Sequence, residues 1–182
     1  MLQIRMHGRG GQGAQMAAQI LATAFFREGK YVQAFATYGG ARRGTAVSSF
    51  IRIDDRPIRL RCDIENPDAV LCFDASLLDG KLLQGIEEDT TLLVNSTMPK
   101  EAFTELGNYN IFSIDGIAIA RRNGLGRIVN SVLLGALAGL LDAPDFENLQ
   151  SVVKDLSPVK ISENLSSCRD GYELARKFKG VA

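Results

Sequence analysis

Cysteine is scarce in this sequence of 182 residues, and tryptophan is absent. Cys62, Cys72 and Cys168 are an odd number of thiols without Cys-x-x-Cys spacing. This pattern argues against a disulfide framework and against an iron–sulfur or zinc site carried by this chain. We expect structural thiols in a reducing compartment and no metal ligands, and therefore a cytoplasmic protein.

A net charge is also lacking. The 21 basic residues balance the 21 acidic ones, so the chain has no general attraction for nucleic acid or an anionic membrane. The apolar run at residues 129–141 is shorter than the roughly 20 residues of a membrane span. The first residues show no basic-then-apolar leader. We expect neither nucleic acid nor a membrane among the partners.

The chain does have enough apolar sequence for a core, since 46% of its residues are hydrophobic. Its length fits one domain over residues 1–182. Strand-like and helical patterns alternate along most of it. Strands are expected at residues 2–6, 31–36, 69–73, 91–95 and 110–114, and helices at 12–27, 76–84, 100–106, 117–122, 129–141, 145–156 and 162–179.

A β-hairpin is predicted within this alternation. Residues 46–53 and 57–61 both alternate apolar and polar side chains, and Asp54 and Asp55 form a turn between them. Alternating strands and helices elsewhere indicate a mainly parallel sheet. The predicted fold class is therefore α/β and Rossmann-like, with a mainly parallel sheet, helices on both faces, an inserted β-hairpin and a helical C-terminal third.

A glycine-rich turn directly follows the first predicted strand. It matches G-x-G-x-x-G between a strand and a helix, with the residues Gly8, Arg9, Gly10, Gly11, Gln12 and Gly13. Small residues let the backbone approach a phosphate, whose charge then lies on the free N–H groups of the helix start. We predict phosphate binding here. The alternative is a tight turn whose glycines only allow the helix to pack on the sheet.

NAD is a poor candidate for the ligand. A dinucleotide domain carries an acidic residue at the end of its second strand to hold the ribose hydroxyls, whereas residues 33–37 contain no acid. A second loop lies beyond this strand, with the residues Tyr38, Gly39, Gly40, Ala41, Arg42, Arg43 and Gly44. Its two guanidinium groups suit an anionic ligand or carboxylates of a partner protein. The alternative is a solvated arginine pair on a surface turn.

Catalytic machinery is not evident. His7, the sole histidine, precedes Gly8, and we expect it to pack against the turn, whose helix N-terminus disfavours its protonated form. Asp74 and Asp115 each come directly after a predicted strand and are expected at the ligand-binding edge of the sheet. The sequence shows no Ser-His-Asp order, metal cluster or paired acids. We therefore predict a binding domain with no catalytic residue of its own.

Together the two glycine loops closely resemble those of the gamma subunit of 2-oxoacid:ferredoxin oxidoreductases, which include pyruvate synthase. Further matches occur in order at residues 50–59, 67–71 and 129–136, so the similarity spans roughly residues 1–175. The Arg42-Arg43-Gly44 form of the second loop and the sequence of the predicted hairpin slightly favour the pyruvate-type branch over the 2-oxoglutarate branch. This resemblance implies that the chain is a piece of a larger enzyme.

The resemblance also implies CoA-dependent oxidative decarboxylation of a 2-oxoacid to an acyl-CoA, with electrons passed to ferredoxin. It places thiamine diphosphate and iron–sulfur clusters on partner subunits (alpha, beta and, where present, delta) and no cofactor on this chain alone. It associates the gamma-type chain with the CoA site and with subunit assembly. Carried over to this sequence, the binding positions are Gly8, Gly10, Gly11, Gln12, Gly13, Tyr38, Gly39, Arg42, Arg43, Gly44 and Asn130.

Two other functions stay open. One is a stand-alone NAD(P)-dependent enzyme with the same fold, and the missing acid after the second strand is its main obstacle. The other is a purely structural assembly subunit, in which the glycine loops only make backbone contacts with partners. The isolated chain is expected to be inactive.

Overall fold

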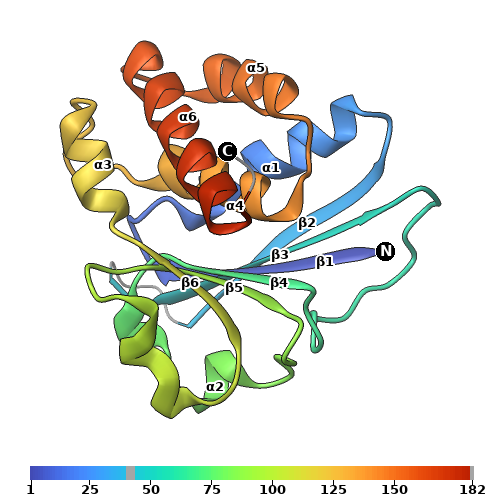
Figure 1. Ribbon diagram of the computed structural model, residues 1–182. Helices are drawn as coiled ribbons and strands as arrows, with labels where there is room; N and C mark the ends of the chain where they lie inside the picture. The colour runs from blue at the N-terminus through green and yellow to red at the C-terminus, as the bar shows by residue number, and fades with distance from the viewer. Residues whose placement is uncertain (40–43, 181–182) are drawn as a thin grey trace.

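The computed structural model describes residues 1–39 and 44–180. Six strands form one sheet in the order β2-β3-β1-β4-β5-β6 (Figure 1). β1, β4, β5 and β6 pair in parallel, whereas β3 pairs antiparallel with both β1 and β2. The strands are β1 (Leu2–Arg9), β2 (Tyr31–Tyr38), β3 (Ala46–Asp54), β4 (Ala69–Cys72), β5 (Thr91–Asn95) and β6 (Asn110–Ile114).

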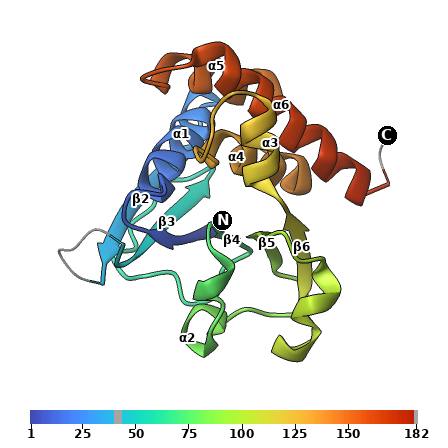
Figure 2. The same cartoon turned by 90° about the vertical axis from the view of Figure 1, so that its left-hand side faces the viewer.

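Helices cover both faces of this sheet unequally, as Figure 2 shows from the side. The longer helices lie on one face, with the short helix α2 on the other. The long elements are α1 (Ala14–Arg27), α4 (Asn130–Leu141), α5 (Phe146–Leu156) and α6 (Ile161–Phe178); the short ones are α2 (Gly80–Leu83), α3 (Gly116–Arg122), and the 3₁₀ turns η1 (Ala75–Leu77) and η2 (Lys100–Leu106). The Rossmann-like α/β class with a helical C-terminal third is confirmed.

The predicted hairpin is wrong in its second strand. Residues 57–61 form no strand, and β3 instead lies between β1 and β2. Both hydrogen-bonding edges of β3 are therefore occupied, so no edge is left for residues 57–61. Residues 76–84, expected to form one helix, are divided between η1 and α2.

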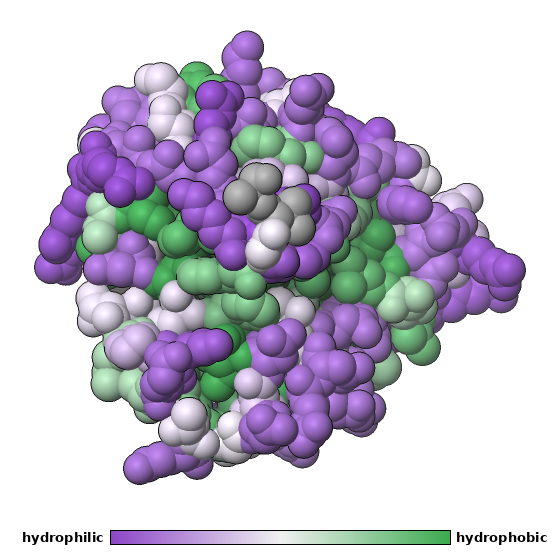
Figure 3. All heavy atoms as spheres, in the orientation of Figure 1, coloured by the Kyte–Doolittle hydropathy of each residue, from purple (hydrophilic) through white to green (hydrophobic). Residues whose placement is uncertain are grey.

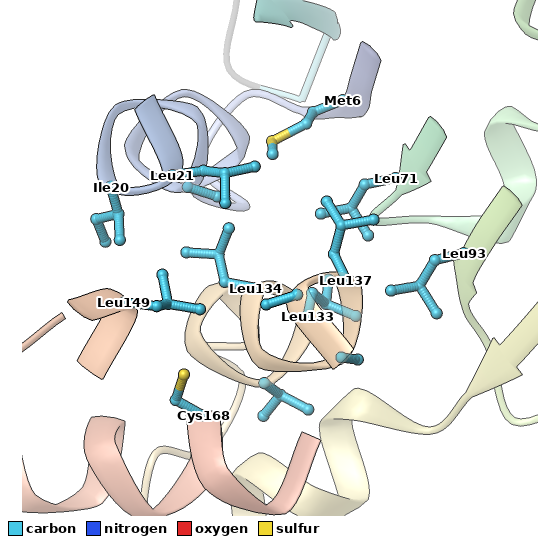
Figure 4. Close-up of a cluster of buried hydrophobic side chains, with 14 of the residues drawn as sticks. Met6, Ile20, Leu21, Leu71, Leu93, Leu133, Leu134, Leu137, Leu149 and Cys168 are labelled. Carbon is cyan, nitrogen blue, oxygen red and sulfur yellow. The ribbon is translucent and has the colours of Figure 1, made fainter. Parts of the chain in front are cut away.

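The main core lies between the sheet and the long helices, with α4 at its centre (Figure 4). Because side chains alternate along a strand, Leu71 of β4 joins this core, whereas Val70 and Cys72 join a smaller core on the α2 face. α4 packs tightly on α6: a Cβ added at Gly135 would lie 1.9 Å from the carbonyl oxygen of Cys168. The apolar run in this region is thus a buried helix, as predicted.

The other half of the sheet carries buried polar side chains on its α2 face, beside the stacked rings of Phe35 and Phe50. The register aligns Gln3, Arg52 and Gln33 across β1, β3 and β2. Arg52 is 1% exposed and donates to Gln3 Oε1, Gln33 Oε1 and the Asp63 carbonyl at 3.2, 2.9 and 3.0 Å. The coil after β3 covers this row with its backbone, since Gln33 Nε2 also donates to the Leu60 carbonyl at 2.7 Å.

The two ends of the sheet differ in how they are covered. Within the described residues β2 pairs only with β3, and its eight residues include no charged side chain. At the other end, the ring of Phe112 on β6 lies 6.0 Å from that of Phe178 on α6.

Figure 3 shows a hydrophobic band across the face seen in Figure 1, on an otherwise largely hydrophilic surface. None of the helices in the described ranges has the length and apolar character needed to cross a membrane.

Candidate functional site

The glycine turn joins β1 to α1 at the carboxyl edge of the sheet. β1 continues to Arg9, so Gly8 belongs to the strand and the turn begins at Gly10. Gly11 and Gly13 have φ values of 97° and 87°, the left-handed region in which a side chain is disfavoured. A Cβ at Gly8 would lie 3.1 Å from Ala14 Cβ and 3.3 Å from Phe73 Cβ. Glycines here allow both the turn and the close approach of helix to strand.

The N-terminus of α1 opens at this turn without a side-chain cap. Uncapped N–H groups and the positive end of a helix of this length favour an anion. Asn130, the first residue of α4, lies against the turn, because a Cβ at Gly13 would be 3.1 Å from Asn130 Nδ2. The structure thus brings Asn130 together with the first glycine loop.

A side-chain network stiffens the turn from the β4 side. Gln12 Oε1 accepts from the Arg9 backbone N–H at 2.7 Å, and Gln12 Nε2 donates to Asp74 Oδ2 at 3.2 Å. Arg9 Nε donates to the same oxygen at 3.1 Å. Burial raises the pKa of Asp74, but hydrogen bonds from Ser76, Gln12 and Arg9 outweigh it, so the pKa lies below its usual value. Asp74 therefore stays ionised at neutral pH.

The end of the second loop also meets the first. Gly10 N donates to the Thr45 carbonyl at 2.9 Å, and Gly44 N donates to the Gly10 carbonyl at 3.3 Å. Tyr38 lies farther along, 57% exposed, and its hydroxyl donates to Gln15 Oε1 of α1 at 2.6 Å. Arg42 and Arg43 lie outside the described residues, together with Gly40 and Ala41.

A cleft of about 880 Å³ opens beside the first loop, where β1, β4, β5 and β6 end. Asp74 and Asp115 line it, as expected from their positions after strands. Asp115 caps α3 by accepting from the Ala118 N–H at 2.9 Å. The other polar or glycine lining residues are Arg9, Gly10, Gly11, Gln12, Gly44, Asn95, Ser96, Thr97, Arg121 and Arg127.

Arg121 and Arg127 are the binding candidates that the sequence did not single out. Both are exposed, both line the cleft, and neither forms an ion pair within residues 1–39 and 44–180. The neighbouring Arg122 is instead paired with Asp170 of α6 at 2.8 Å. The only sequence signal for a binding residue here was the adjacent pair Arg121 and Arg122, in the last turn of α3. Which of these two guanidinium groups faces the cleft depends on how α3 packs.

Tyr38 and Gly39 line a different cleft of about 770 Å³, on the α2 face of the sheet, together with His7. Burial, then the charge of Arg5, lower the pKa of His7 from 6.5 to about 4, so these causes replace the helix N-terminus invoked from the sequence. Its Nδ1 lies 3.1 Å from Ser48 Oγ. Among the described residues no three His, Cys, Asp or Glu side chains gather as a metal site.

Comparisons with known proteins agree on one family. Residues 3–174 match the family described as pyruvate ferredoxin/flavodoxin oxidoreductase. The chain is 45% identical over 176 residues to the pyruvate synthase subunit PorC of Methanothermobacter marburgensis, covering 95% of this chain and 97% of that protein. It is 39% identical over 184 residues to the pyruvate/ketoisovalerate oxidoreductases common subunit gamma of Pyrococcus abyssi, covering 98% and 100%.

A solved structure shares the fold. The pyruvate oxidoreductase subunit PORC of Thermotoga maritima superposes with a TM-score of 0.84 at 36% identity, covering 94% of this chain and 95% of that one. The similarity therefore extends over nearly the whole of both chains.

Proposed function

Since this chain belongs to the pyruvate ferredoxin/flavodoxin oxidoreductase family and is a gamma subunit of such an enzyme, we propose that its glycine-loop cleft binds the phosphate groups of coenzyme A. The enzyme would convert a 2-oxoacid and CoA to an acyl-CoA and CO₂, with two electrons passed to ferredoxin. Thiamine diphosphate and iron–sulfur clusters would lie on the alpha, beta and delta partners. The isolated chain would then be a cytoplasmic binding subunit without activity.

The observation that carries this proposal is the convergence of donors in one cleft. The uncapped start of α1 adjoins it, as do Arg121 and Arg127, which form no ion pair with any other residue that the structure describes. CoA carries a pyrophosphate and a 3′-phosphate, so several anionic groups must be bound at once, and guanidinium and backbone N–H groups are suited to them. About 880 Å³ is within the range of small-molecule sites.

A dinucleotide fits this arrangement less well. In a dinucleotide domain the second strand pairs directly with the first, which brings the acid at its end to the ribose. Here β3 separates β2 from β1, and β2 ends at Thr37 and Tyr38 without an acid. The end of β2 therefore lies one strand away from the position that ribose recognition requires.

We propose pyruvate as the 2-oxoacid. The relative from M. marburgensis is named a pyruvate synthase subunit, whereas that from P. abyssi is common to pyruvate and ketoisovalerate oxidoreductases. A branched-chain 2-oxoacid is thus the second candidate. Assaying the purified complex with both acids at saturating CoA distinguishes them, and a higher kcat/KM for ketoisovalerate would reject pyruvate.

Arginine variants of the purified complex test the CoA site. We expect Arg121→Ala and Arg127→Ala each to raise the KM for CoA about tenfold, the effect of one lost charge-assisted contact, with kcat within about twofold. Arg42→Ala and Arg43→Ala test the second loop in the same assay. Arg122→Ala is the matched control, because this neighbour pairs with Asp170 outside the cleft, and its KM should not change.

Further arms separate the remaining alternatives. With 3′-dephospho-CoA as the substrate, substitution of the arginine that binds the 3′-phosphate should raise the KM much less than it does with CoA. Unchanged KM values in all the arginine variants would favour a purely structural subunit. Calorimetric binding of NADH more tightly than CoA would favour a dinucleotide enzyme. Purification of the native chain without thiamine- and iron–sulfur-containing partners would contradict its place in the complex.

A further inference from the structure

Asp74 comes after β4 and lies beside the glycine turn, at the point where the sheet's connections diverge. Both of its carboxylate oxygens are used. Oδ1 accepts from the N–H and the hydroxyl of Ser76 at 3.0 and 2.6 Å. Oδ2 accepts from Arg9 Nε and Gln12 Nε2 at 3.1 and 3.2 Å. The Ser76 contacts hold the carboxylate in place, and its second oxygen is directed at the glycine turn.

This contact decides which way the Gln12 amide faces. An ionised carboxylate only accepts hydrogen bonds, so the NH₂ group of Gln12 must face Asp74. Its oxygen then faces the opposite way, toward the Arg9 backbone N–H, from which it accepts at 2.7 Å. Gln12 thereby spans the turn from the helix side back to the strand side. The chain Asp74–Gln12–Arg9 N–H is ordered by the charge of Asp74.

The same carboxylate occupies the Arg9 side chain. Arg9 Nε binds Asp74, and its terminal nitrogen binds Ser76 Oγ at 2.9 Å. Arg9 lines the cleft, but its charge is already balanced by the ion pair with Asp74, whereas neither Arg121 nor Arg127 has an ion pair in the described part of the chain. Asp74 thus holds Arg9 within the turn, whereas Arg121 and Arg127 are available to bind a ligand.

From this geometry we infer that Asp74 is a positioning residue, which holds Gln12 and Arg9 so that the glycine turn presents its backbone N–H groups to phosphate. The expected effect of Asp74 on CoA binding rests on the proposed function, whereas its expected effect on the order of the glycine turn does not. Since the two can be measured separately, failure of one is distinguishable from failure of the other.

Exchanging the amide of position 12 for the carboxylate of position 74 is the sharpest test. Gln12→Glu places a second carboxylate about where Nε2 now meets Asp74, and the two anions repel. In Gln12→Glu combined with Asp74→Asn, the charge has moved across the contact: the amide introduced at position 74 can donate to the new carboxylate, which still accepts from the Arg9 N–H. The double variant therefore restores the hydrogen bond between positions 12 and 74 at the same net charge of the cleft, but not the one from Arg9 Nε, which an amide nitrogen cannot accept. Any recovery reports the geometry of the contact between positions 12 and 74.

Hydrogen exchange of the purified complex measures the order of the turn. We expect amides in residues 9–13 to exchange about tenfold faster in Gln12→Glu and in Asp74→Asn, and to return part of the way to the original rate in the double variant. Asp115→Asn is the matched control: it removes one carboxylate from the same cleft, but its contact is with Ala118. It should leave exchange at residues 9–13 unchanged.

The KM for CoA of the purified complex is the second measurement. Gln12→Glu should raise the KM for CoA about tenfold with kcat within about twofold, and the double variant should bring the KM back. Unchanged exchange in Gln12→Glu, failure of the double variant to recover, or equal loosening by Asp115→Asn would overturn the inference. If exchange behaves as expected while neither Arg121→Ala nor Arg127→Ala alters the KM, Asp74 positions the turn and the CoA proposal alone fails.

Discussion

The two halves of the sheet are covered by different means. Around β4 and β5, apolar side chains point to both faces and pack against helices or 3₁₀ turns. Around β1, β3 and β2, the helix face is apolar, whereas the α2 face carries arginine, glutamine, histidine and serine beside the stacked rings of Phe35 and Phe50. The first half is held by packing, and the second by donors that meet backbone carbonyls.

Irregular chain can cover a sheet when the sheet supplies hydrogen-bond donors. Coil has carbonyl groups that need donors once water is excluded, and the polar rows provide them. Arg5 illustrates this: it is 6% exposed, and its Nη2 donates to the carbonyls of Leu82, in the last turn of α2, and of Gln84, in the chain just beyond it, at 2.8 and 2.9 Å. Burial lowers the pKa of this guanidinium, although Arg5 remains charged at neutral pH.

The largest effect is expected at Arg52. Arg52→Ala empties a fully buried site and leaves three acceptors without their donor, so it should lower the free energy of unfolding by about 4 kcal/mol. Leu93→Ala in the apolar half should cost about 3 kcal/mol through its cavity. Urea denaturation of the chain measures both, with exposed Arg56→Ala as control. A loss below about 1 kcal/mol at Arg52 would mean that the polar rows do not hold this half.

An intermediate, pH-dependent effect is expected at His7. Its pKa is about 4 in the folded chain against an ordinary 6.5, so the unfolded chain binds the proton more readily. Stability should therefore fall as the pH drops from about 6.5 to 4, with a loss of about 2 kcal/mol between pH 7 and pH 5. Urea midpoints at the two pH values measure it.

The acidic groups with shifted pKa values do not interfere in this window. Asp54, Asp74, Asp142 and Asp170 have pKa values below the usual 3.8, and Glu163 has a pKa below the usual 4.5. The stability that these groups contribute is present above those values and is lost only at lower pH. His7→Asn should remove the loss between pH 7 and pH 5. An equal loss in that variant would assign the effect to other groups.

The smallest effect is expected at Gln33, at the open end of the polar half. Gln33→Ala removes the donor to the Leu60 carbonyl and one acceptor of Arg52. Because Gln33 is only half-buried and water can replace part of these contacts, the loss should be about 1 kcal/mol. Gln19→Ala, on the exposed side of α1, should stay within about 0.5 kcal/mol in the same urea titration.

Local features of this fold could be predicted from the sequence. The helices α1, α5 and α6 were found from their own periodicity, α4 from its apolar run, and the glycine turn from the spacing of Gly8, Gly10 and Gly13. The placement of Asp74 and Asp115 in the cleft came from one rule, that parallel strands end at the same edge. In each case the information lies within a short stretch of chain.

Non-local features could not be predicted in the same way. The position of β3 between β1 and β2 depends on which strand edges pair, and the alternation in residues 57–61 is equally compatible with a strand. Those residues became coil because both edges of β3 were already taken. The place of Arg127 in the lining of the cleft was missed because it depends on how the chain after α3 returns to the cleft.

The edge strand β2 has a consequence for how the enzyme is produced. Its eight uncharged residues, whose outer side pairs with no other strand in the described part of the chain, lack the lysines or prolines that usually discourage strand addition. Wherever no other protein covers this edge, it is available for strand addition by a second copy of the chain. The strand order therefore constrains how the chain can be produced on its own, because a high concentration of isolated copies favours their association through β2.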